Sequence, residues 1–128
     1  MNPAGWLLSI AILVAASAAQ GATCLQSNVD GAIAEGRLSL GQFEDAAGRK
    51  EQAFILTLPN TACLSGPDEM DNLKDVETIH VFSVDDALSS ELRESIGKNV
   101  RVRGNPFPAH TAHHHAPIVM GISEIDPL

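Results

Sequence analysis

The period of the hydrophobic pattern changes twice in the second half of the chain, and few folds accommodate such a change. Apolar and polar residues alternate over residues 76–84, with one slip in phase, which is typical of a half-buried strand. Leu88, Leu92 and Ile96 then recur at intervals of four, and this spacing places them on one face of a helix. We therefore expect a helix over about residues 86–96, buried through these three side chains.

Signals for both ends of this helix are present. Asp85 or Asp86 can cap its first turn, because a carboxylate accepts hydrogen bonds from the unpaired N–H groups there. Gly97 can adopt the left-handed conformation that ends many helices. Alternation returns over residues 98–104, which predicts a further strand.

Three more segments are predicted to be strands. Residues 28–40 alternate loosely, residues 53–58 form a short apolar run that Pro59 ends, and residues 116–125 are again apolar. The order is therefore three strands, a helix and two strands. A helix between the third and fourth of five strands is the order of the OB-fold, a small Greek-key barrel. We expect this mainly β fold, with a β-sandwich and another small α+β domain as the alternatives.

An apolar segment near the first residue predicts export. Residues 6–19 are apolar or small without interruption, a run shorter than the roughly 20 residues that a membrane-spanning helix needs. Small residues follow, as a secretory cleavage site requires, although no Lys or Arg precedes the run. We therefore expect residues 1–22 to be a secretory signal peptide and residues 23–128 to form a single OB-like domain. The expected location is periplasmic or secreted, with no membrane span after cleavage.

The charge of the chain argues against two classes of partner. Asp and Glu number 16 and Lys and Arg number 8, which gives a formal net charge of −8. Binding to a nucleic-acid backbone needs a basic surface, and so does binding to an anionic membrane. We therefore expect neither partner, whereas the charge favours solubility.

The two cysteines, Cys24 and Cys63, are expected to form a disulfide. An even number of cysteines in an exported chain is typical of disulfide pairing. The bond would close a loop of about 40 residues, which is worth roughly 3–4 kcal/mol in the chain-entropy model. The competing interpretation is a redox or metal pair, but no CxxC spacing is present.

Four of the 5 histidines lie in one short segment: His110, His113, His114 and His115. Imidazole is a common ligand of zinc and copper, so this segment predicts a metal site. Alternate residues of an extended chain point to the same side. His113 and His115 are therefore expected on one side and His114 on the other, with His110 able to join either. The other interpretation is structural, with these side chains hydrogen-bonded to loop backbone that no sheet satisfies.

Two ligand sets are open for such a site. One is His110 with His113 and His115, and the other is His114 with a distant carboxylate such as Glu124 or Asp126. His80 falls within a predicted strand, and we interpret it as an ordinary strand residue rather than a ligand. The sequence contains no nucleophile elbow, dinucleotide-binding motif or phosphate-binding loop, so no catalytic residue is assigned.

Three segments carry a family resemblance. TCLQ (residues 23–26), LRESIGKNVRVRGNPF (92–107) and HTAHHHAPIVM (110–120) resemble the exported bacterial family described as domain of unknown function 4431. Its pattern has a Cys after the signal, a second Cys after a strand, a Gly-Lys-x-Val-x-Val-x-Gly strand and a His-Thr-x-His-His loop. The resemblance implies export and the extent of the domain but assigns no activity. The third adjacent histidine, His115, lies outside this pattern.

Two functions from different classes fit these observations. The first is a non-enzymatic binding or accessory domain whose histidine-rich loop contacts a metal ion, such as zinc or copper, or a small ligand, a peptide or a glycan. In an OB-fold this loop joins strands four and five, where ligands often bind. The alternative is a metal-dependent, hydrolase-like enzyme in which the histidines hold an activated water. The first is favoured because no separate general base accompanies the histidines in the sequence.

Overall fold

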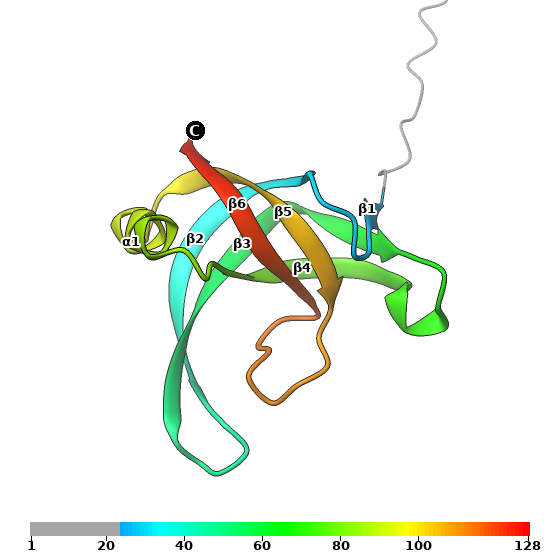
Figure 1. Ribbon diagram of the computed structural model, residues 1–128, viewed down its shortest axis with the longest axis horizontal. Helices are drawn as coiled ribbons and strands as arrows, with labels where there is room; N and C mark the ends of the chain where they lie inside the picture. The colour runs from blue at the N-terminus through cyan, green and yellow to red at the C-terminus, as the bar shows by residue number, and fades with distance from the viewer. Residues whose placement is uncertain (1–23) are drawn as a thin grey trace, which may run out of the picture.

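The computed structural model describes residues 24–128 and consists mainly of β-strands (Figure 1). Its elements are, in chain order, β1 (Leu25–Gln26), β2 (Ala32–Glu44), β3 (Lys50–Ser65), the 3-10 turn η1 (Glu69–Asp71), β4 (Leu73–Phe82), α1 (Asp86–Glu94), β5 (Asn99–Pro108) and β6 (Ile118–Pro127). The expected signal peptide, residues 1–22, lies outside the described residues. Within residues 24–128, no helix is both long and apolar enough to cross a membrane.

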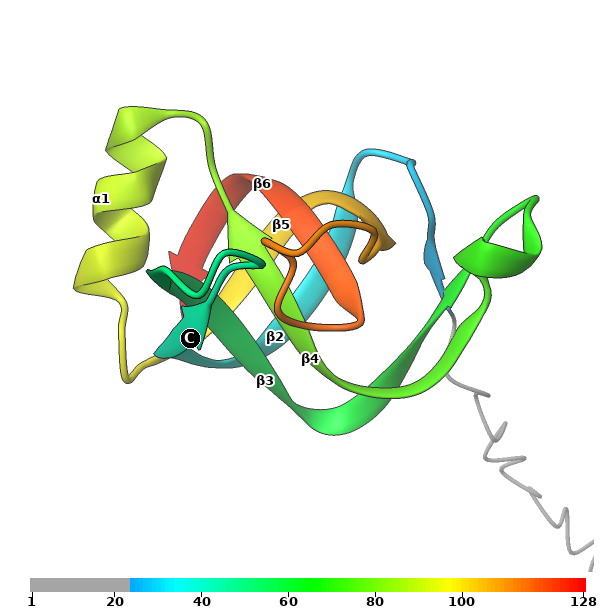
Figure 2. The same cartoon turned by 90° about the horizontal axis from the view of Figure 1, so that it is seen from below.

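Five of the strands close into a barrel (Figures 1 and 2). β2 pairs with β3, and β3 with β4, both antiparallel. β4 pairs in parallel with β6, and β5 pairs antiparallel with both β6 and β2. The helix α1 follows the third barrel strand, as in an OB-fold, so the predicted five-stranded barrel is confirmed. The short β1 pairs in parallel with β3 alone.

Alternating side chains of the barrel strands fill the interior. Each barrel strand contributes a fully buried aliphatic residue: Leu38 from β2, Leu56 from β3, Ile79 from β4, Val100 from β5 and Met120 from β6. These side chains meet because alternate residues of a strand point to the same face of a sheet. Their burial is worth roughly 25 cal/mol per Å² of apolar surface removed from water, which makes this cluster the main source of stability.

The strand β3 is longer than its sequence predicts. The expected strand ended before Pro59, yet β3 continues to Ser65. Its pairing with β4 is interrupted between Thr57 and Ala62, where the register shifts. A proline has no N–H to donate, and an irregularity of this kind is where a strand tolerates one.

The extension of β3 brings Cys63 to Cys24. The two cysteines are bonded, with their Cα atoms 4.5 Å apart, which confirms the predicted disulfide. Leu25 pairs with Leu64 directly after the bond. The disulfide therefore fastens β1 to the far end of β3.

The helix α1 lies at one side of the barrel (Figures 1 and 2). Asp85 is its N-cap and accepts a hydrogen bond from the backbone N–H of Leu88, with an N···O distance of 2.9 Å. Leu92 is fully buried in the core, and Leu88 packs against the same cluster while partly exposed. Two of the three predicted helix contacts are therefore present.

The prediction that Ile96 is buried on the same face was wrong. The helix ends at Glu94, so Ile96 lies beyond the last helical residue and is 39% exposed. Gly97, at φ 85°, then turns the chain toward β2, and its N–H donates to the carbonyl of Leu38 at 2.7 Å. The helix stops before the third apolar residue because the chain must turn there to begin β5.

Candidate functional site

The histidine loop, residues 109–117, joins β5 to β6 and lies beside the β2–β3 hairpin (Figures 1 and 2). The N–H of Ala109 donates to the carbonyl of Pro117 at 3.0 Å and holds the two ends of the loop together. Inside the loop, the N–H of His114 donates to the carbonyl of Thr111 at 3.2 Å. The parallel pairing of β6 with β4 begins directly after the loop, so the loop also adjoins β4.

One carboxylate of β3 contacts two histidines of the loop. The Oε2 atom of Glu51 lies 2.8 Å from Nδ1 of His113, and its Oε1 atom accepts a hydrogen bond from Nε2 of His115. The His113 side chain is 66% exposed, whereas that of His115 is 10% exposed. These two hydrogen bonds, first that from His115 and then that from His113, lower the pKa of Glu51. The carboxylate therefore stays ionised and each ring presents an N–H to it.

His115 is fixed by rings on β2 and β4 as well. Its ring stacks on Phe43 with the centroids 4.1 Å apart and the planes 5° apart. The ring of His80 lies 5.9 Å away at an angle of 25°. The backbone N–H of His115 donates to Nδ1 of His80 at 3.2 Å. The orientation of His115 is thus set by contacts from three strands, since Glu51 belongs to β3.

His80 is held in its neutral form. Burial, followed by the neighbouring His115 and His114, lowers the pKa of His80 to about 4. Because Nδ1 accepts a hydrogen bond, the proton of the neutral ring belongs on Nε2. His80 therefore serves as an acceptor that anchors the loop to β4.

The other two loop histidines form a separate pair. The rings of His110 and His114 meet edge to face, with their centroids 4.7 Å apart. The Nδ1 atom of His114 accepts backbone N–H groups from His110 at 3.0 Å and from Thr111 at 3.3 Å. Burial, followed by the neighbouring histidines, lowers the pKa of His114. His114 thus satisfies loop backbone, as the structural interpretation expected, while His110 also packs on Phe107.

The four histidines singled out in the sequence are therefore divided. The structure brings His113 and His115 together on Glu51, and it places His110 with His114 rather than with that pair. The carboxylate that reaches the loop is that of Glu51, and not that of Glu124 or Asp126, which were expected from the sequence. Glu124 lies 3.5 Å from Arg103 in an ion pair on the β5–β6 side of the barrel.

Sequence reasoning missed both Glu51 and His80 as partners of the loop. Glu51 is 62 positions from His113, and a single glutamate at the start of a strand carries no signal of its own. A signal for His80 did exist. In the predicted OB-fold the third strand pairs with the fifth, so a residue on the third strand lies next to the loop that precedes the fifth.

Two imidazoles and one carboxylate are donors that divalent transition metals accept. Among residues 24–128, no three His, Cys, Asp or Glu side chains are already arranged to hold such an ion. Instead, Glu51, His113 and His115 hydrogen-bond to one another. A cation would have to replace the protons shared in those bonds.

The C-terminal part of the chain matches a known family model. Residues 78–126 match the model of the family described as Domain of unknown function (DUF4431). A search of curated proteins found no match. The matched segment runs from within β4 through the histidine loop to β6, so it contains His80 and the loop histidines but not Glu51. The resemblance seen in the sequence is thereby confirmed: residues 78–126 are similar to the domain of unknown function 4431.

Proposed function

We propose that the protein is an exported, non-enzymatic accessory domain that binds a divalent transition metal, zinc or copper, through Glu51, His113 and His115. One observation carries the proposal. Nδ1 of His113 and Nε2 of His115, both in the histidine loop, face the carboxylate of Glu51 on the distant strand β3. Three donors of the types that zinc and copper prefer therefore meet at one place.

The contacts around these donors favour metal binding further. Phe43 and His80 fix the ring of His115, so little ordering remains to be done when an ion arrives. The formal net charge of −8 attracts cations to the surface. Three protein ligands leave a position of a tetrahedral zinc ion open, which a water or a group of a peptide or glycan partner can fill.

Export is supported by the cysteine chemistry. The disulfide between Cys24 and Cys63 is the kind of bond that persists in periplasmic or extracellular conditions and is rare in a reducing cytosol. Cell fractionation with an antibody against the barrel tests this part of the proposal. A chain recovered with the cytosol at full length would contradict export.

Calorimetric titration with zinc chloride and copper chloride tests the metal site. We expect saturable binding at pH 7.5 that weakens below about pH 6.5, because the metal competes with protons for the imidazole nitrogens. Glu51→Gln and His113→Ala should each weaken binding about tenfold or more, since the first replaces a charged carboxylate ligand by a neutral amide and the second removes an imidazole ligand. His110→Ala is the matched control, because His110 is in the same loop but does not contact Glu51. Absence of saturable binding at micromolar protein, or an equal loss in the control, would contradict the proposal.

A further inference from the structure

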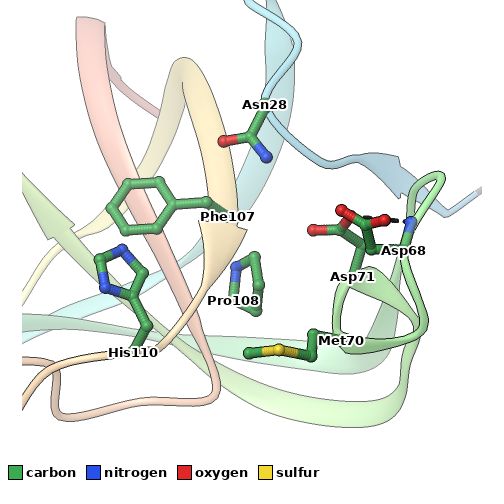
Figure 3. Close-up of a pocket in the computed structure, with 7 residues that line it drawn as sticks. All are labelled: Asn28, Asp68, Met70, Asp71, Phe107, Pro108 and His110. Carbon is green, nitrogen blue, oxygen red and sulfur yellow. Dashed lines mark hydrogen bonds between the residues drawn. The ribbon is translucent and has the colours of Figure 1, made fainter.

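A recess lies between the histidine loop and the η1 turn. A cavity of about 540 Å³ separates the η1 turn from the end of β5 (Figure 3). Asp68, Met70 and Asp71 line it from the turn, and Phe107 and His110 line it from the opposite side. Its volume is within the range of small-ligand sites, roughly 300–1,000 Å³.

The hydrogen bonds of the polar wall leave mainly acceptors for a ligand. Ser27 donates its hydroxyl to Oδ1 of Asp71 at 2.8 Å, and the N–H of Asp68 donates to Oδ2 of Asp71 at 3.2 Å. The side-chain NH₂ of Asn28 donates to the Ser27 hydroxyl at 3.2 Å. The donors of this wall are therefore directed into the protein. Carboxylate and amide oxygens are the polar groups that remain for the cavity.

This wall is also anchored to the rest of the barrel. Asp71 is only 6% exposed and is one of two buried polar residues among those described. The backbone N–H of Asn28 donates to the carbonyl of Pro106 at 2.7 Å, which fixes the segment before β2 to β5. The carboxylate of Asp71 thus keeps its position, and a ligand meets a preorganised negative charge.

The opposite wall is apolar and aromatic. Phe107 and Pro108 at the end of β5 line the cavity opposite the turn, with Pro108 nearer the turn and the Phe107 ring directed toward His110 (Figure 3). Met70, which is 70% exposed, lies below them in the same view. An aromatic face beside carboxylates suits a delocalised cation, which stacks on the ring while it donates to the oxygens. Guanidinium is planar and weakly hydrated, so it fits both walls better than an ammonium does.

We propose that this cavity binds a guanidinium group on an apolar stem, such as an arginine side chain of a peptide or a small guanidine. The carboxylate of Asp68 accepts its N–H groups, the negative charge of Asp71 reinforces the attraction, and Phe107 and Pro108 take the planar face and stem. The site is distinct from the metal set, because its nearest loop residue, His110, does not contact Glu51.

NMR titration of the full folded chain with N-acetyl-arginine amide tests the proposal, with EDTA present so that no metal takes part. We expect shifts confined to the cavity and no saturable shifts with N-acetyl-citrulline amide, which has nearly the same shape but no charge. An Arg-containing peptide that binds more tightly than the amide identifies a peptide as the source. Equal affinity for the peptide and for the arginine amide identifies a small guanidine as the source.

Two variants of the η1 turn give a matched comparison. Asp68→Asn should weaken binding of the arginine amide about tenfold, because it removes one charge-assisted hydrogen bond while keeping the size of the side chain. Glu69→Gln removes the same charge from the next residue, which does not line the cavity, and should leave affinity within about twofold. Unfolding midpoints confirm that both variants fold. Binding of citrulline amide as tight as that of arginine amide, or equal losses in the two variants, would overturn the proposal.

Discussion

His80 fastens the histidine loop to β4 through one hydrogen bond that only a neutral ring can accept. Its Nδ1 atom takes the N–H of His115, and protonation would place a second donor opposite that N–H. The lowered pKa of about 4 keeps the ring neutral across the neutral pH range. The position of His115, and so its contact with Glu51, therefore depends on a residue that is not itself one of the proposed ligands.

We predict that His80 makes the fold less stable in acid. Its pKa in the folded state, about 4, is below the ordinary value of 6.5, so between these values the unfolded chain binds more protons. Stability is therefore full above about pH 6.5 and is lost as the pH falls toward 4. Urea unfolding at pH 7 and pH 5 should show a loss about 1 kcal/mol smaller in His80→Asn than in the native chain. If the free energy of unfolding falls equally in His80→Asn and in the native chain between pH 7 and pH 5, protonation of His80 does not cause the loss.

At the residue scale, the sequence supplied the loop histidines but not their partners. The sequence expectation placed His113 and His115 together and His114 apart by assuming an extended segment. The same grouping is found in a loop that turns at Thr111–His114. Glu51 entered the site through the packing of β3 against the loop, which depends on tertiary geometry. His80 could have been found only by combining its place in a strand with the parallel pairing of an OB-fold.

At the scale of elements, α1 shows which part of a helix a sequence determines well. Its start follows from Asp85, whose carboxylate meets the unpaired N–H of Leu88. Its end depends on where the chain must turn to begin β5, and the apolar spacing carried the prediction to Ile96 too far. Pro59 had the opposite effect on β3, because the irregular pairing that accommodates a proline is not visible in the sequence.

Leu92 and Ile96 provide a direct test of that boundary. Leu92→Ala should lower the free energy of unfolding by about 2–5 kcal/mol, because it leaves a cavity beneath a fully buried side chain. Ile96→Ala should cost less than about 1 kcal/mol, because its side chain is 39% exposed. Chemical denaturation of the two variants measures both values. Similar losses would mean that the helix continues through Ile96.

At the scale of the whole molecule, the order of strands and helix was predictable because it depends on periodicity along the chain. The barrel also contains a covalent tie, since the disulfide joins the segment before β2 to the far end of β3. Because the cysteines are 39 residues apart, the bond removes much conformational entropy from the unfolded chain and so stabilises the folded one.

We predict that breaking this bond lowers stability without opening the barrel. The double variant Cys24→Ser, Cys63→Ser should lose about 3–4 kcal/mol of unfolding free energy, the chain-entropy value for a loop of this size. Circular dichroism should still show a β-rich fold, because β1 pairs with β3 alone. Thiol titration of the unfolded, unreduced native chain should find no free cysteine. Two reactive thiols would contradict the disulfide itself.

The position of β6 has a consequence for how the chain reaches its final form. The last strand in chain order lies between β5 and β4, so both of those strands present unpaired edges until it arrives. The barrel is then closed by contacts between segments distant in sequence. Such contacts form slowly, because the chain loses the entropy of closing the intervening loop before the contacts stabilise it. The barrel therefore cannot close until β6, the last strand of the chain, has joined both neighbours.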